Sequence, residues 1–110
     1  MSDILSILYE TLKTRRAADP AESYVAMLHR RGIDKIGGKI AEEAAETLIE
    51  AVRGDRARCA EESADLLFHL LVLWAHLEIP PADVFRILEN RLGKGGHAEK
   101  AMRSGPDHKT

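Results

Sequence analysis

Apolar residues recur along this chain at the three- and four-residue spacing that places side chains on one side of a helix. This pattern predicts five helices separated by short breaks. Alanine and leucine far outnumber valine and isoleucine, and neither Asn-Gly nor Asp-Gly occurs as a hairpin signal. The predicted fold class is therefore all-α.

The first two predicted helices are short. Asp3 is expected to cap a helix that fades near Arg15. Asp19-Pro20 is expected to open a second helix, which Arg31-Gly32 closes. The predicted apolar positions are Ile4, Ile7, Leu8 and Leu12 in the first helix and Tyr24, Met27 and Leu28 in the second.

The third predicted helix covers about residues 35–53, with Asp34 as its start. Glycine weakens a helix by roughly 1 kcal/mol per residue. Because Gly37 and Gly38 fall in the first turns, ordered helix is expected to begin near Lys39. The predicted apolar face contains Ile36, Ile40, Ala44, Thr47, Leu48 and Ala51.

A break at Arg53-Gly54-Asp55 separates this helix from a fourth, over about residues 56–77, with Asp55 as its cap. Its second half is apolar almost all round, which predicts burial on most sides. Pro80-Pro81 starts a fifth helix that Gly93 stops. Since so much apolar surface needs a cover in a small chain, we expect a homodimer or a larger homo-oligomer. The narrow polar strip of the fourth helix contains Arg58, Glu62, Asp65, His69 and His76.

The composition fits one small domain. The chain has 110 residues and a net charge of −2, so no general attraction to nucleic acid or to an anionic membrane is expected. We expect a single domain over residues 1–103 and a disordered tail over residues 104–110. The only cysteine is Cys59, the apolar run over 66–77 is too short to span a bilayer, and no signal sequence is recognisable. These features predict a soluble, cytoplasmic protein.

Two acidic pairs carry the candidate chemistry. Glu43 and Glu46 are three residues apart, as are Glu62 and Asp65, so each pair shares one side of its helix. If the two helices fold back on each other, four carboxylates meet and repel unless protons or cations neutralise them. Mg²⁺ suits such a site because it binds a few carboxylates, keeps water ligands and completes its shell with phosphate oxygens.

Other interpretations of these residues stay open. Glutamates at this spacing often form only a solvated helix face, and His69 is more often a hydrogen-bonded core residue than a ligand. Lys35 and Lys39 precede Glu43 closely enough to contact metal-bound phosphate. Pairing with nearby glutamates is their alternative role.

Together these residues resemble a known family. Glu43-x-x-Glu46, then 15 residues (47–61), then Glu62-x-x-Asp65 is similar to the signature of the MazG-like, all-α nucleoside triphosphate pyrophosphohydrolases. More closely, the chain resembles the phosphoribosyl-ATP pyrophosphatases. The matching segments, in the family's order, are 16–20, 23–24, 34–36, 39–46, 64–73 and 99–101. Departures from the family pattern are Gly37-Gly38, Ala41 and Gly95.

The resemblance implies a MazG-like helical bundle that hydrolyses phosphoribosyl-ATP to phosphoribosyl-AMP and pyrophosphate, the second step of histidine biosynthesis. It implies Mg²⁺, with Mn²⁺ as the alternative, bound by the four acids of the two pairs. Glu46, with Glu42 nearby, would orient or deprotonate the attacking water, while Lys39 and Lys35 would hold the leaving pyrophosphate. The phosphate of the phosphoribosyl group, here called the distal phosphate, would be bound by Lys94, Lys100 and Arg103.

Two alternatives accompany this interpretation. The first is a general pyrophosphohydrolase of noncanonical nucleoside triphosphates that uses the same metal site. The second is a non-catalytic helical dimerisation module whose acids are merely solvated.

Overall fold

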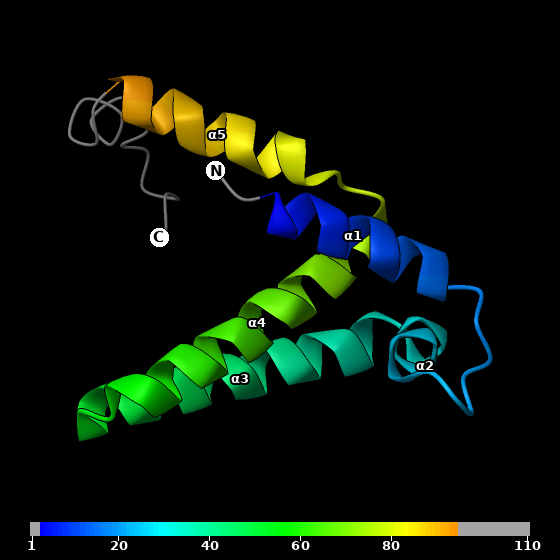
Figure 1. Ribbon diagram of the computed structural model, residues 1–110, viewed down its shortest axis with the longest axis horizontal. Coiled ribbons are helices and arrows are strands. Elements are labelled where there is room, and N and C mark those ends of the chain that lie inside the picture. Colours follow the sequence, from blue (N-terminus) through cyan, green and yellow to red (C-terminus); the bar gives the residue numbers. More distant parts are fainter. Residues whose placement is uncertain (1–2, 95–110) are drawn as a thin grey trace.

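Residues 3–94 fold into five helices and contain no strand, as expected for an all-α protein. A computed structural model describes residues 3–94. The helices are α1 (Ile4–Arg15), α2 (Tyr24–Arg31), α3 (Ile33–Arg53), α4 (Arg56–Leu77) and α5 (Pro81–Lys94). The two longest, α3 and α4, form an antiparallel hairpin (Figure 1). Helix α1 crosses α4, α2 packs at the start of α3, and α5 lies along α1 on the side away from the hairpin (Figure 1).

Side-chain caps set two of the helix starts. Asp55 accepts a hydrogen bond from the main-chain N–H of Arg58 at 3.0 Å, which confirms it as the cap of α4. The cap of α2 is Ser23, whose hydroxyl accepts from the main-chain N–H of Ala26. The prediction that Asp19-Pro20 opens this helix is wrong. Asp19 instead accepts from Ala21 N–H, the local bond by which aspartate stabilises a turn.

Helix α3 begins earlier than its sequence suggests. It starts at Ile33 after Gly32, whose φ of 88° is a conformation that glycine adopts readily. Asp34 lies inside the first turn, and the helix continues through Gly37 and Gly38. The expected start near Lys39 is therefore wrong. Ile36, fully buried beside the glycines, supplies packing that outweighs their poor helix propensity.

The core lies where four helices meet. Its fully buried large side chains are Leu12, Leu28, Ile36, Leu71 and Val72, from α1 to α4. Trp74 is partly buried and packs against this core. In α1 the buried side is Tyr9 and Leu12, whereas Ile4 and Ile7 are exposed. The buried side of α1 is thus rotated about the helix axis relative to the predicted one. Apolar residues occur on two sides of α1, and only one of these sides packs against α4.

The buried side of α3 also differs from the prediction. Glu43 and Glu50 are each only 7% exposed, while Leu48 is 65% and Val52 81% exposed. The acidic side of α3 therefore faces α4 and the more apolar side faces outward. Four large apolar side chains between Leu48 and Leu67 of the hairpin remain exposed: Leu48, Ile49 and Val52 of α3 and Leu67 of α4. We call these four residues the outer apolar surface.

A histidine pair, of which His29 is buried and His76 half-buried, joins α2 to the end of α4. The Nδ1 atoms of His29 and His76 lie 3.0 Å apart, and the rings stack with centroids 5.3 Å apart. Arg16 nearby donates to the main-chain oxygen of Ala75 at 3.2 Å. Burial, then the charge of Arg16 and the closeness of His76, lower the pKa of His29 from 6.5 to about 4. Burial, followed by Arg16, also lowers the pKa of His76.

Helix α5 begins at Pro81 and runs through Gly93 to Lys94 rather than stopping at the glycine. Within residues 3–94, no helix combines the length and the apolar character that a membrane crossing requires. The predicted tail over residues 104–110 lies outside the described residues.

Candidate active site

Three carboxylates from the two helices of the hairpin converge. Oxygens of Glu43 on α3 and of Glu62 and Asp65 on α4 all lie within 4.8 Å of one another. The tight turn at Gly54 makes this possible, because its left-handed conformation ends α3 and lets α4 return alongside it at once. We call these three residues the acidic cluster. The expected meeting of acids from the two pairs therefore occurs.

The acidic cluster is poorly neutralised by the protein itself. One carboxylate oxygen of Glu43 and one of Glu62 are buried without a hydrogen-bond partner among the described residues. Burial, and then the closeness of Glu43, raise the pKa of Glu62. Buried carboxylate oxygens without donors are costly. A bound cation or a shared proton would relieve that cost.

Glu46 lies at the edge of the cluster. It is not among the three residues whose oxygens converge, but burial and then the closeness of Glu62 raise its pKa. Glu46 is half-buried, whereas its neighbour Glu42 is exposed. The fourth predicted ligand thus lies beside Glu62, outside the group of three whose oxygens converge.

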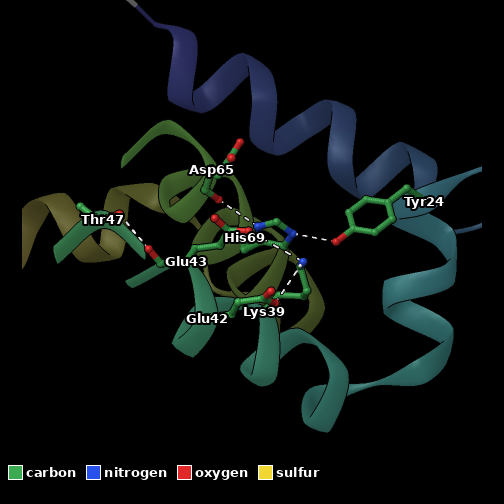
Figure 2. A network of polar contacts seen from close by, with 7 residues as sticks. All are labelled: Tyr24, Lys39, Glu42, Glu43, Thr47, Asp65 and His69. Atoms are coloured by element: carbon green, nitrogen blue, oxygen red, sulfur yellow. Dashed lines mark hydrogen bonds and ion pairs between the residues drawn. The ribbon is translucent and has the colours of Figure 1, made fainter. Parts of the chain in front are cut away.

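Lys39 is the cation nearest to these acids. Its Nζ lies 3.3 Å from Glu42 and 3.8 Å from Glu43, one turn farther along α3 (Figure 2). The hydrogen bond with Glu42 is the largest cause that raises the pKa of Lys39. Lys35 is half-buried one turn earlier on the same helix. A phosphate arriving at the cluster would therefore find an ammonium group already held at its edge.

A histidine and a tyrosine extend the site toward α2. His69 is 6% exposed, its Nδ1 lies 2.9 Å from the main-chain oxygen of Asp65, and its Nε2 lies 2.9 Å from the hydroxyl of Tyr24 (Figure 2). His69 is therefore the hydrogen-bonded buried group that was favoured over a ligand. Tyr24 was predicted on the apolar side of its helix, yet it is 45% exposed and its hydroxyl points to the site. Its position directly after the Ser23 cap is the signal that could have separated it from the core residues that follow.

Of the basic residues expected to hold the distal phosphate, none has a described side chain. Lys94 ends α5, and its side chain is outside the described part of the structure. Lys100 and Arg103 lie beyond residue 94. Their roles stay predictions.

Comparison with known proteins gives a consistent result. The sequence profile of the family described as Phosphoribosyl-ATP pyrophosphohydrolase matches residues 5–92. A protein of Azospirillum brasilense named Phosphoribosyl-ATP pyrophosphatase is 54% identical over 100 residues, which cover 91% of this chain and 90% of the relative. Relatives of the same name from Geobacter sulfurreducens and Rhizorhabdus wittichii are 50% and 52% identical, and the alignments cover 93% and 94% of this chain and 94% and 97% of theirs.

Proposed function

The chain belongs to the phosphoribosyl-ATP pyrophosphohydrolase family, and on that premise we propose that it hydrolyses phosphoribosyl-ATP to phosphoribosyl-AMP and pyrophosphate at the acidic cluster. The relatives' name describes this hydrolysis, and we propose that it serves as the second step of histidine biosynthesis. The observation that carries the proposal is the convergence of Glu43, Glu62 and Asp65 within 4.8 Å, from two helices. A merely solvated helix face would not bury unpaired carboxylate oxygens.

The donor set fits a hard divalent cation. All three groups offer oxygen, two of their oxygens are buried without a partner among the described residues, and Asp65 is exposed to solvent. These properties match Mg²⁺, with Mn²⁺ as the alternative, and do not match ions that require thiolate or imidazole ligands. Glu43, Glu62 and Asp65 would hold the ion, and Glu46 would supply a fourth carboxylate. When bound, the ion neutralises charge on the phosphate oxygens.

The chain's own residues would carry the remaining steps. The oxygen of a water molecule joins one phosphorus atom of the α–β anhydride, the bridging P–O bond breaks, and one proton of the water passes to a carboxylate. Glu46 is our candidate for orienting that water and accepting the proton. Glu42 lies one turn before it on the same side of α3. Lys39 would exchange its contacts with Glu42 and Glu43 for the departing pyrophosphate. Lys35, one turn before it, would supply a second charge.

The outer apolar surface supports a second copy of the chain as partner. Leu48, Ile49, Val52 and Leu67 are between 46% and 81% exposed on the hairpin that carries the cluster. Large apolar side chains exposed in numbers mark association surfaces. A homo-oligomer would cover them and extend the bundle from two long helices to four. A cytoplasmic location is proposed with it, since Cys59 has no second cysteine with which to form an internal disulfide.

The test is pyrophosphate release from phosphoribosyl-ATP by the purified protein, with and without Mg²⁺. We expect rapid, metal-dependent release, with ATP and dCTP left largely intact. Glu43→Gln keeps the size of the side chain and removes the charge, so it should lower turnover by at least about 100-fold while the helical circular dichroism is unchanged. Glu89→Gln on α5, far along the chain from the cluster, is the matched control. Wild-type turnover by Glu43→Gln would remove Glu43 from the site.

A further inference from the structure

The hydrogen bonds of His69 determine which atom carries the proton of Tyr24. The main-chain oxygen of Asp65 only accepts, so Nδ1 of the neutral imidazole must carry the hydrogen in that 2.9 Å contact. Nε2 is then a bare acceptor, and the hydroxyl of Tyr24 donates to it at 2.9 Å. The two rings meet edge to face, with an interplanar angle of 90°. The one proton of the phenol is therefore directed away from solvent and toward His69.

The oxygen of Tyr24 consequently has lone pairs left and no hydrogen to give. Tyr24 is 45% exposed as a residue, and its hydroxyl is directed toward His69 on the side where Lys39 lies (Figure 2). Burial is the largest influence on the pKa of the Tyr24 hydroxyl and raises it. Of the nearby charges, Lys39 lowers this pKa, whereas Glu43, Glu42 and Asp65 raise it. In Figure 2 these residues lie on the side of Tyr24 to which its hydroxyl points. An acceptor of fixed orientation thus lies near Lys39 and two members of the acidic cluster, Glu43 and Asp65.

We propose that Tyr24 contacts the bound nucleotide complex, accepting a hydrogen bond from an O–H group, and that His69 is the positioning residue that fixes this orientation. The inference rests on the function proposed for the acidic cluster. An ionised phosphate oxygen is itself only an acceptor, so it does not match Tyr24 in this arrangement. Two sources offer the required O–H: a hydroxyl of the adenosine ribose, or a water molecule held by the cation.

The alternative is that the Tyr24–His69 bond only ties α2 to α4. A tie of this kind would affect stability, by about 1 kcal/mol for one hydrogen bond. It would leave the kinetics of the folded enzyme unchanged. Steady-state kinetics well below the melting temperature therefore separates the two roles.

The first experiment compares the wild type with Tyr24→Phe on phosphoribosyl-ATP and on analogues that each lack one hydroxyl of the adenosine ribose. We expect Tyr24→Phe to lower kcat/KM by about tenfold, the effect of one lost hydrogen bond. If the donor is a ribose hydroxyl, the loss is in KM and disappears with one of the deoxy analogues. If the donor is cation-bound water, the loss is in kcat, persists with every analogue and raises the Mg²⁺ concentration needed for half-maximal rate. Tyr9→Phe, in the other tyrosine and within the core, is the control and should keep both constants.

The second experiment tests His69 as the positioning residue. His69→Leu should reproduce the kinetic loss of Tyr24→Phe, and His69→Gln, which keeps an acceptor, should restore part of it. The double variant Tyr24→Phe/His69→Leu should be no slower than the slower single variant, because the two residues act as one unit.

The outcomes separate this inference from the function beneath it. Normal wild-type turnover together with unchanged kcat and KM in Tyr24→Phe overturns the inference alone. Additive losses in the double variant overturn the role of His69. Absence of wild-type turnover on phosphoribosyl-ATP overturns the proposed function and this inference with it.

Discussion

The pair of His29 and His76 predicts a loss of stability at mildly acidic pH. His29 is 8% exposed and its pKa falls from 6.5 to about 4 on folding. Below pH 6.5, His29 therefore binds a proton in the unfolded chain but not in the folded chain. The free energy of unfolding consequently decreases as the pH falls. The stability is fully present above about pH 7, is lost progressively from 6.5 down to about 4, and levels off below that for this group.

The magnitude follows from the same two values. A difference between 6.5 and about 4 corresponds to about 3 kcal/mol when the whole window has been crossed, and to about 2 kcal/mol at pH 5. The lowered pKa of His76 adds to the loss in the same direction. Since small domains are stable by about 5–15 kcal/mol, a change of this size is easily measured.

Urea unfolding followed by circular dichroism between pH 8 and pH 5 is the assay, because most carboxylates stay ionised over that range. We expect the midpoint to fall steadily below pH 6.5 in the wild type and to be nearly independent of pH in a His29→Gln/His76→Gln variant. Wild-type stability that is flat from pH 8 to pH 5, or a pH slope that survives in the variant, would refute the reasoning.

Three further predictions follow from the hairpin. Saturating Mg²⁺, at about 100 times its dissociation constant, should stabilise the wild type by about 3 kcal/mol, seen as a higher melting temperature; Glu43→Gln should lose this shift, and an equal shift in both proteins would contradict the assignment. Val52→Asp, at an 81% exposed position of the outer apolar surface, should lower the molar mass in light scattering and leave the helix content intact; a wild-type protein that is already a monomer would rule out the proposed assembly. Asp55→Ala should lower stability by about 1 kcal/mol through the lost cap of α4, whereas Asp55→Asn should lose far less; equal losses would mean that the cap is not the cause.

Much of the architecture could be predicted because the signals are local. The all-α class, the bounds of α4 and the cap at Asp55 depend on residues close in sequence, and the structure confirms them. The meeting of Glu43 with Glu62 and Asp65 also follows from local facts, namely helical spacing and a short turn.

The wrong predictions concern features that are determined by contacts with a neighbouring helix. Periodicity identifies the apolar positions of α3, but it does not say that α4 would cover Glu43 and leave Leu48 outside. The low helix propensity of Gly37 and Gly38 predicts a later start for α3, but the burial of Ile36 outweighs that propensity. Tyr24 was assigned to an apolar face because its partner, His69, is 45 residues away along the chain. Such pairings become visible only when the helices are placed in space.

The hairpin also constrains how this chain may change in length. The direction in which each acid points depends on its position along its own helix. Only Gly54 and Asp55 separate α3 from α4, so the turn cannot absorb an extra residue. One residue inserted between Glu46 and Gly54 would rotate the rest of the hairpin by about 100° and carry Glu62 away from Glu43. An arm lengthened by about seven residues in each helix, two turns on either side, would keep the acids opposite one another. Insertions compatible with activity are therefore expected in matched pairs within the hairpin, or outside it altogether.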